Sequence, residues 1–312
     1  MDNKKLISVV VPVYNEEGML FEVYERTTAV LQGLTEYDYE IVFFDDGSTD
    51  SSREQIEKLT EKDEHIKAVF YSRNFGYSKN IYYSVRESKG DCTIILHSDL
   101  QNPPELIPEF VEKWEKGSDI VLGVKNKSGE NPFMYLMRSL FYFIVNAVFG
   151  VKLVPHATEF ELFDKTFTDV LKRTHVPRPF LRELILEYGR HFDYVYYTQD
   201  KRKKGKSKFN ISKYYDFAIC GIANMATKLP RRMLVISGLC FIAALGELIF
   251  NYIPDYLHGY VHSLTDGLVF RGTLFVAIIV LGFLSIMLEF IVHIIATVNQ
   301  KPIVVEERRI NY

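Results

Sequence analysis

The stretch ILHSDLQNPPE, residues 95–105, ends an apolar run with groups that can bind a metal ion. Asp99 and Gln101 place a carboxylate and an amide oxygen at alternating positions, and Mg²⁺ and Mn²⁺ take such oxygen ligands while bridging phosphates. His97 adds an imidazole, which suits Mn²⁺ better than Mg²⁺. A histidine hydrogen-bonded at a strand end explains His97 equally well, and a cap for the helix that the prolines begin is the competing interpretation of Asp99.

A second acidic stretch, FFDDGSTDSS at residues 43–52, also follows an apolar run. Asp45 and Asp46 can accept hydrogen bonds from a base or a ribose. Asp50 suits the N-cap of the next helix, and this structural role is compatible with a binding role for the first two carboxylates. No G-x-G-x-x-G follows the first apolar run, which disfavours a dinucleotide-binding oxidoreductase.

A basic stretch, KRKKGKSKFNISKYYDF at residues 201–217, has six Lys or Arg residues among positions 201–208. General attraction to anionic lipid explains it as well as a clamp for a membrane-borne phosphate does. Its position just before a long apolar run favours a role at a membrane.

Alternating strand and helix patterns must position these residues, and they predict an α/β domain with a mainly parallel sheet. Strands are expected at residues 6–13, 39–46, 66–72, 92–98 and 118–124, with helices at 17–33, after residue 47, at 77–88 and from Pro103 to Trp114. Such sheets bind ligands at the carboxyl ends of their strands, so the polar residues that follow each strand should meet.

The C-terminal third contains two long apolar runs, residues 233–253 and 272–298. Each can span a bilayer core of about 30 Å, and a pair of buried helices in a soluble domain is the alternative. Glu289 and His293 share a helix face, which favours helix packing in an oligomer over a proton relay. The flanking basic residues are Arg231, Arg232, Lys301, Arg308 and Arg309. By the positive-inside rule we expect a plasma-membrane protein with both termini in the cytoplasm.

The expected organisation has four parts. They are a cytoplasmic catalytic domain at 1–210, an amphipathic juxtamembrane helix at 211–230, a transmembrane hairpin at 231–299 and a cytoplasmic tail at 300–312. The apolar segment 133–149 suits a helix that lies in the membrane interface or packs on the sheet. The net charge of −3 argues against nucleic-acid binding. Three cysteines are too few for a disulfide framework or a thiolate zinc site.

Taken in order, VVVPVYNEE, FDDGSTD, SRNFGYSKN, SDLQNPPELI and KGKSKF, before two expected membrane helices, resemble the polyprenyl-phosphate glycosyltransferases. These are inverting family-two enzymes of the GT-A fold, similar to bactoprenol glucosyltransferases and dolichyl-phosphate mannose synthases. The resemblance implies a hexosyltransferase in which undecaprenyl phosphate attacks the anomeric carbon of a UDP-hexose or UDP-N-acetylhexosamine. It also implies Mg²⁺ or Mn²⁺, contact with membrane lipid, and a homo-oligomer such as a tetramer.

The resemblance also implies residue roles. The nucleotide-binding positions are Pro12, Tyr14, Glu16, Asp45, Asp46, Arg73 and Asn74. The metal positions are His97, Asp99 and Gln101, and the catalytic positions are Asp99 and Glu159. The acceptor and phosphate positions are Arg138, Ser139, Arg202, Lys206, Ser207 and Lys208.

Three departures from the family pattern bear on mechanism. His97 stands where the family has the first aspartate of D-x-D, Glu159 replaces an aspartate, and Glu161 replaces an arginine. These departures would be compatible with an inactive member of the family. The retained Asp99, Gln101 and basic loop favour an active one.

Two rival functions remain at this point. A transferase acting on another lipid or glycan acceptor predicts more membrane spans or a Q-x-x-R-W motif, and the sequence has neither. A non-catalytic membrane scaffold that binds nucleotide sugars predicts lost metal ligation, which the histidine at position 97 allows.

Overall fold

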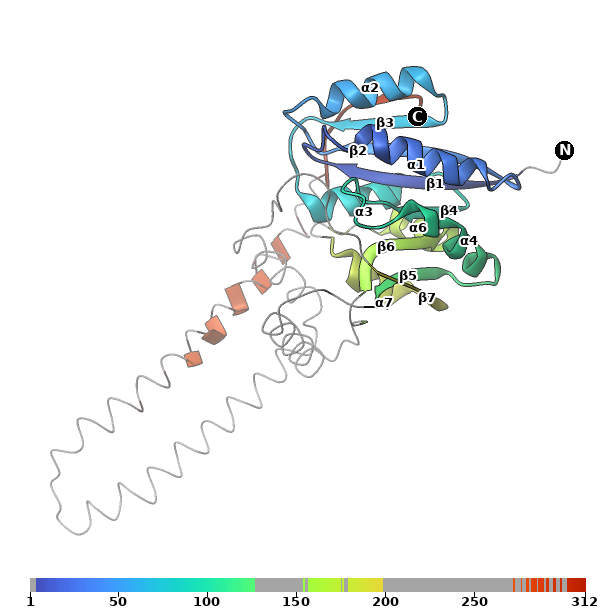
Figure 1. Ribbon diagram of the computed structural model, residues 1–312. Coiled ribbons are helices and arrows are strands. Elements are labelled where there is room, and N and C mark those ends of the chain that lie inside the picture. The colour runs from blue at the N-terminus through green and yellow to red at the C-terminus, as the bar shows by residue number, and fades with distance from the viewer. Residues whose placement is uncertain are drawn as a thin grey trace, which may run out of the picture.

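The computed structural model describes residues 4–126, 154, 157–174, 176, 179–198 and 302–312, with isolated helical positions between 272 and 298. Among these residues, eight strands form one sheet that lies between two layers of helices (Figure 1). The strands are β1 Lys5–Val13, β2 Tyr37–Asp45, β3 Ile66–Tyr71, β4 Cys92–Ile95, β5 Ile120–Lys125, β6 Ala157–Asp164, β7 Phe192–Tyr197 and β8 Glu306–Ile310. The helices are α1 Leu20–Gln32, α2 Ser52–Lys62, α3 Tyr77–Glu87, η1 Pro104–Leu106, α4 Ile107–Glu115, α6 Lys165–Arg173 and α7 Leu181–Tyr188.

The sheet order is β7-β5-β6-β4-β1-β2-β3-β8. Strand β1 pairs in parallel with β2 and β4, β2 with β3, and β5 with β7, whereas β6 and β8 run antiparallel to their neighbours. The expected α/β domain and its parallel centre are therefore confirmed. Because of these directions, the carboxyl ends of six strands meet the amino ends of β6 and β8 at one edge, hereafter the carboxyl edge.

The core explains why the strands read as continuous apolar runs. Neighbouring residues Val9 and Val10 of β1 are both fully buried, but they pack into different clusters on opposite faces of the sheet. The cluster of Val9 includes residues of α1, α2 and α4, and that of Val10 includes residues of α3, α6 and α7. A sheet covered on both faces needs apolar side chains at successive positions rather than at alternate ones.

Strand β4 ends earlier than its apolar run predicts. The expected strand 92–98 stops at Ile95, and a turn follows in which the Leu100 N–H bonds to the His97 carbonyl at 3.3 Å. Leu100 has a φ of 51°, which lies outside the strand region. The correction matters because it moves His97 and Asp99 from a strand into a turn.

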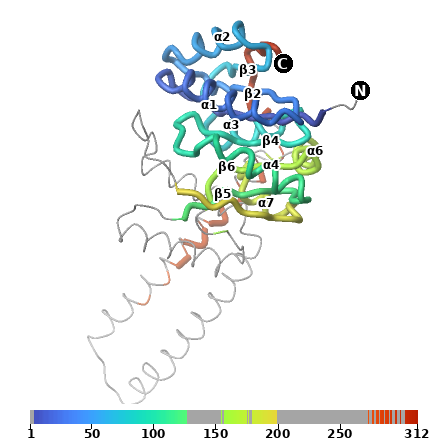
Figure 2. Tube along the Cα trace, turned by 45° about the vertical axis from the view of Figure 1, so that its right-hand side comes forward, coloured from blue at the N-terminus to red at the C-terminus, as the bar shows by residue number. Residues whose placement is uncertain are grey.

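Three strands were not expected from the sequence pattern. Strand β6 lies between β4 and β5, β7 forms one edge of the sheet beside β5, and the C-terminal strand β8 forms the other edge beside β3. Figures 1 and 2 both place the C-terminus close to β3 and α2. The last part of the expected tail at 300–312 is thus a component of the sheet.

Among the described residues, no helix combines the length and the apolar character needed to cross a bilayer. The expected span 233–253 and the expected helices 133–149 and 211–230 lie outside the described residues, and 272–298 is described only in part.

Candidate functional site

The loops that follow β1 and β2 are joined by hydrogen bonds at the carboxyl edge. Asn15 has a φ of 53°, and its side-chain oxygen accepts a 2.7 Å hydrogen bond from the Thr49 N–H. The Asn15 N–H donates to the Ser48 hydroxyl at 2.8 Å, and the Glu16 N–H donates to Ser52 Oγ at 2.9 Å. The predicted nucleotide-binding residues that flank Asn15 are therefore held against the loop that follows β2.

Asp46 joins the loop after β2 to the loop after β3. Its two carboxylate oxygens accept hydrogen bonds from the N–H groups of Phe75 at 2.7 Å and Gly76 at 2.9 Å. Burial raises the pKa of Asp46 to about 6, and the two N–H donors act in the opposite direction. Arg73 and Asn74, which are predicted to bind the nucleotide, lie exposed in the same loop, directly before Phe75 and Gly76.

Gly47 is where these two loops approach most closely. Its φ is +68°, and a Cβ atom there would lie 2.5 Å from the Arg73 carbonyl carbon and 2.7 Å from the Asn74 nitrogen. Because backbone atoms cannot move aside as the end of a side chain can, the position requires glycine.

Asp45 is fully buried and is balanced by a residue that the sequence analysis did not single out. The Arg53 Nε donates to Asp45 Oδ2 at 2.9 Å, and Arg53 Nη2 donates to the Tyr71 carbonyl at 2.9 Å. The Ser48 N–H also lies 3.2 Å from Asp45 Oδ2. The sequence did contain a signal for this ion pair, namely a basic residue in the first turn of the helix that follows two acidic residues.

The turn after β4 carries the predicted metal residues. Asp99 Oδ1 accepts a 3.2 Å hydrogen bond from the Gln101 N–H, which closes a local turn. The helical turn η1 has Pro103 at its N-cap, so Asp99 does not cap it. The His97 ring stacks on Tyr77 with ring centroids 6.0 Å apart and 21° between the planes.

Glu159 enters the site from the first residues of β6 and lies between two partners. The Tyr77 phenol donates a hydrogen bond to Glu159 Oε2, and the Arg182 Nε lies 3.7 Å from Glu159 Oε1. Burial and the Glu159 carboxylate raise the pKa of the Tyr77 phenol well above its usual value, so the phenol stays protonated. Tyr77 is the first residue of α3 and Arg182 the second of α7, and the sequence analysis missed both.

Glu161 lies two residues further along β6 and is only 2% exposed. Burial raises its pKa to about 8, Arg182 opposes the shift, and Glu159 adds to it. Glu161 is therefore mostly protonated at neutral pH. Where the family pattern has a charged arginine, this chain therefore has a neutral carboxyl group.

The donor set at the β4 turn fits a divalent cation that also binds phosphate. Within the described residues, no three His, Cys, Asp or Glu side chains gather in a way that could hold a metal. One carboxylate with an amide oxygen is what Mg²⁺ needs when phosphate oxygens and water complete its shell. Asp99 and Gln101 supply those groups and His97 lies beside them, so the residues suit a cation that arrives with a diphosphate.

The predicted acceptor residues lie outside the described part of the chain. They are Arg138, Ser139, Arg202, Lys206, Ser207 and Lys208. Pro12 is buried near the end of β1, and Tyr14 and Glu16 are partly exposed in the loop that follows. The structure thus brings the predicted donor and metal residues to one edge.

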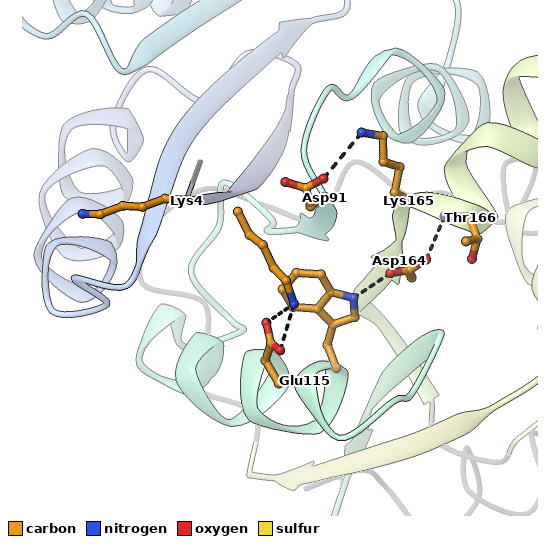
Figure 3. A pocket seen from close by; sticks show the side chains of 8 residues that line it. Lys4, Asp91, Glu115, Asp164, Lys165 and Thr166 are labelled. Atoms are coloured by element: carbon orange, nitrogen blue, oxygen red, sulfur yellow. Dashed lines mark hydrogen bonds and ion pairs between the residues drawn. The ribbon is translucent and has the colours of Figure 1, made fainter. Parts of the chain in front are cut away.

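A pocket at the opposite edge of the sheet is a different feature (Figure 3). It is lined by Lys4, Lys5, Asp91, Trp114, Glu115, Asp164, Lys165 and Thr166. Most of its charged groups neutralise one another, with Lys5 Nζ at 2.7 Å from Glu115 and Lys165 Nζ at 3.5 Å from Asp91, and the Trp114 indole donates a hydrogen bond to Asp164 at 2.8 Å. A pocket whose charges are already paired has few groups with which to bind a charged substrate.

Comparison with known proteins gives a consistent match. The family model described as Glycosyl transferase family 2 matches residues 8–189. The SfII prophage-derived bactoprenol glucosyl transferase of Shigella flexneri is 31% identical over 304 residues, covering 95% of this chain and 96% of the relative. The undecaprenyl-phosphate 4-deoxy-4-formamido-L-arabinose transferase of Pseudomonas fluorescens is 33% identical over 247 residues, covering 78% of this chain and 70% of the relative.

Solved structures show the same fold. Glucosyl-3-phosphoglycerate synthase of Mycobacterium tuberculosis, in complex with Mn²⁺, UDP and phosphoglyceric acid, superposes with a TM-score of 0.52 at 16% identity. The match covers 71% of this chain and 78% of that chain. The α/β architecture described above is therefore one that other proteins share at low sequence identity.

Proposed function

The chain belongs to glycosyl transferase family 2, and on this premise we propose that it transfers a hexose from a UDP-sugar to undecaprenyl phosphate. The observation that carries the proposal is the gathering of three carboxylates at the carboxyl edge: Asp46 after β2, Asp99 in the turn after β4 and Glu159 in the first residues of β6. Relatives named as bactoprenol and undecaprenyl-phosphate transferases support the lipid acceptor.

The donor nucleoside would lie on the loops that follow β1, β2 and β3. Tyr14 and Glu16 stand beside the hydrogen-bonded Asn15, and Arg73 is exposed in the loop that Asp46 holds. Loops fixed by internal hydrogen bonds lose little freedom on binding, which favours affinity for the nucleotide.

Asp99 and Gln101, with His97 beside them, would hold Mg²⁺ or Mn²⁺ at the donor diphosphate. When bound, such a cation neutralises negative charge on the departing nucleoside diphosphate. The His97 ring, stacked on Tyr77, has a fixed orientation at this turn.

The chemistry demands positioning more than proton transfer. An acceptor phosphate is already ionised near neutral pH, so attack on the anomeric carbon needs no strong general base. Glu159, fixed by the Tyr77 phenol and the Arg182 guanidinium, can accept a hydrogen bond from a sugar hydroxyl and orient the ring. Fixed orientation lowers the entropic part of the activation barrier.

The acceptor would reach the site from a membrane, as part of a plasma-membrane homo-oligomer with the catalytic domain in the cytoplasm. Large apolar side chains at described helical positions near the C-terminus support this: Val276 is 50% exposed, Leu284 55%, Leu288 61% and Val298 72%. Apolar side chains turned outward on a helix suit a lipid environment. Arg138, Ser139 and the basic residues of 202–208 remain the proposed contacts of the acceptor phosphate.

A transfer assay with purified protein tests the proposal. UDP-glucose, UDP-galactose and their N-acetylated forms are each offered with undecaprenyl phosphate, in Mg²⁺ and in Mn²⁺, to the wild type and to Asp99→Ala. We expect transfer from at least one donor and its loss in the variant. No transfer from any donor would contradict the enzyme proposal, and donor binding without turnover would instead indicate a scaffold.

A further inference from the structure

The C-terminal strand contacts the donor side of the site through one residue. Strand β8 pairs with β3 in antiparallel fashion, so its first residues lie at the carboxyl edge. There Glu307 Oε2 accepts a 2.8 Å hydrogen bond from Arg53 Nη2, across 254 positions of the sequence. A residue near the end of the chain is thus placed beside loops formed by its first 80 residues.

Arg53 connects three strand ends at once. Besides Glu307, it contacts the buried Asp45 carboxylate at the end of β2 and the Tyr71 carbonyl at the end of β3. Its guanidinium also lies over the Phe70 ring, 5.3 Å from the centroid. Since a guanidinium has a planar, rigid set of donors, fixing one of its partners restricts where the others can lie.

We propose that Glu307 and Arg53 are positioning residues through which the C-terminal strand holds the loops 46–50 and 72–76 in the geometry that binds the donor. The inference rests on the proposed function for the identity of that ligand. Glu307 fixes the guanidinium, the guanidinium fixes Asp45 and the end of β3, and the loops that follow these strand ends carry Asp46 and Arg73.

Other contacts hold β8 in place, so the role of Glu307 can be tested separately from strand docking. The Ser72 N–H bonds to the Val305 carbonyl at 3.0 Å, the Tyr83 phenol donates to Glu306 at 2.8 Å, and Arg309 pairs with Glu87 at 2.9 Å. Removing the Glu307 carboxylate therefore leaves the strand paired and frees only one side of Arg53.

The experiment compares Glu307→Ala with Arg308→Ala in the full chain. Arg308 is the matched control because it lies over the Phe70 ring as Arg53 does, but it pairs with Glu57, in the middle of α2, rather than with a strand end. Hydrogen–deuterium exchange reports on the amides of 46–50 and 72–76, and calorimetry measures UDP affinity. For a partly exposed pair we expect UDP affinity to fall about two- to fivefold in Glu307→Ala, with faster exchange in both loops.

Glu307→Gln keeps an acceptor for Arg53 and should restore most of the affinity, while Arg308→Ala should match the wild type in both measurements. Unchanged loop exchange in Glu307→Ala would overturn the inference, and so would faster exchange with unchanged UDP affinity. A wild type that binds neither UDP nor GDP would overturn the proposed function together with the donor role of the ion pair. Loss of UDP affinity in Glu307→Ala but not in Arg308→Ala would support both the proposed function and the positioning role of the ion pair.

Discussion

The Tyr77 phenol donates a hydrogen bond to Glu159 while its ring stacks on His97. One side chain at the start of α3 therefore connects the carboxylate on β6 with the turn that follows β4. The relationship couples two parts of the site that lie more than 60 positions apart in sequence. It explains how a histidine and a glutamate, both departures from the family pattern, fit into one arrangement.

Tyr77→Phe keeps the ring stack and removes the hydrogen bond to Glu159. A hydrogen bond to a charged group contributes about 1.5–3 kcal/mol, so we expect kcat to fall roughly 10- to 100-fold if Glu159 orients the sugar. Tyr24→Phe is the control, because its phenol also donates to a carboxylate, that of Asp63 after the end of α2, away from the carboxyl edge. Equal kcat values in the two variants would remove Tyr77 from the mechanism.

Asp99→Asn should weaken binding of the divalent cation. An amide is a poorer ligand than a carboxylate for a hard cation, and we expect Mn²⁺ affinity in the presence of UDP to fall at least about tenfold. Electron paramagnetic resonance of free Mn²⁺ measures this without turnover. Asp50→Asn is the control, because Asp50 bonds the Ser52 and Glu17 amides instead. Mn²⁺ binding that is identical in the two variants would refute the assignment.

Gly47→Ala should destabilise the protein and weaken donor binding, since the new Cβ would meet the backbone of Arg73 at 2.5 Å. Gly117→Ala is the matched control: its φ is also positive, at +100°, but no atom lies within 4 Å of the added Cβ. The control variant carries only backbone strain of about 1–2 kcal/mol. Thermal unfolding should show a larger loss for Gly47→Ala, and equal losses would mean that the close approach has no cost.

Glu161→Gln should be about as stable as the wild type below pH 4.5 and more stable than it at pH 7, because at pH 7 the wild-type carboxyl is ionised in the unfolded chain but mostly protonated in the folded one. The pKa of Glu161 is raised from 4.5 to about 8, so its contribution to the free energy of unfolding is full below pH 4.5 and is lost as the pH rises through about 8. The glutamine variant lacks that decline. Urea unfolding at pH 5, 7 and 9 measures it, and parallel pH profiles of the two proteins would contradict a buried protonated Glu161.

Several parts of the fold and site follow from local patterns. Apolar runs that end in polar residues predicted the five strands from β1 to β5, and their alternation with helices predicted the parallel centre. The same reasoning placed Tyr14, Asp46, Arg73 and Asp99 at a common edge, because parallel strands that are joined by helices must end on the same side. The family assignment and the likeness in fold confirm the resemblance.

Other parts depend on contacts that no local pattern contains. The early end of β4 depends on a turn at Leu100. The sequence of β6 does not show a clear strand pattern, because Glu159 and Glu161 interrupt its apolar face. Nothing local in the charged segment EERRI indicates an edge strand, since an edge needs little burial and tolerates charges.

The sequence alone determined the order of the first five strands, the chemistry of the residues that follow them and the family. Only the tertiary structure decided which partners those residues have: Tyr77 and Arg182 for Glu159, Phe75 and Gly76 for Asp46, and Arg53 with Glu307 for Asp45. The physical reason is distance along the chain. Hydrophobic periodicity is a property of a few neighbouring residues, whereas a hydrogen bond or an ion pair between distant segments exists only once the sheet has brought its strand ends together.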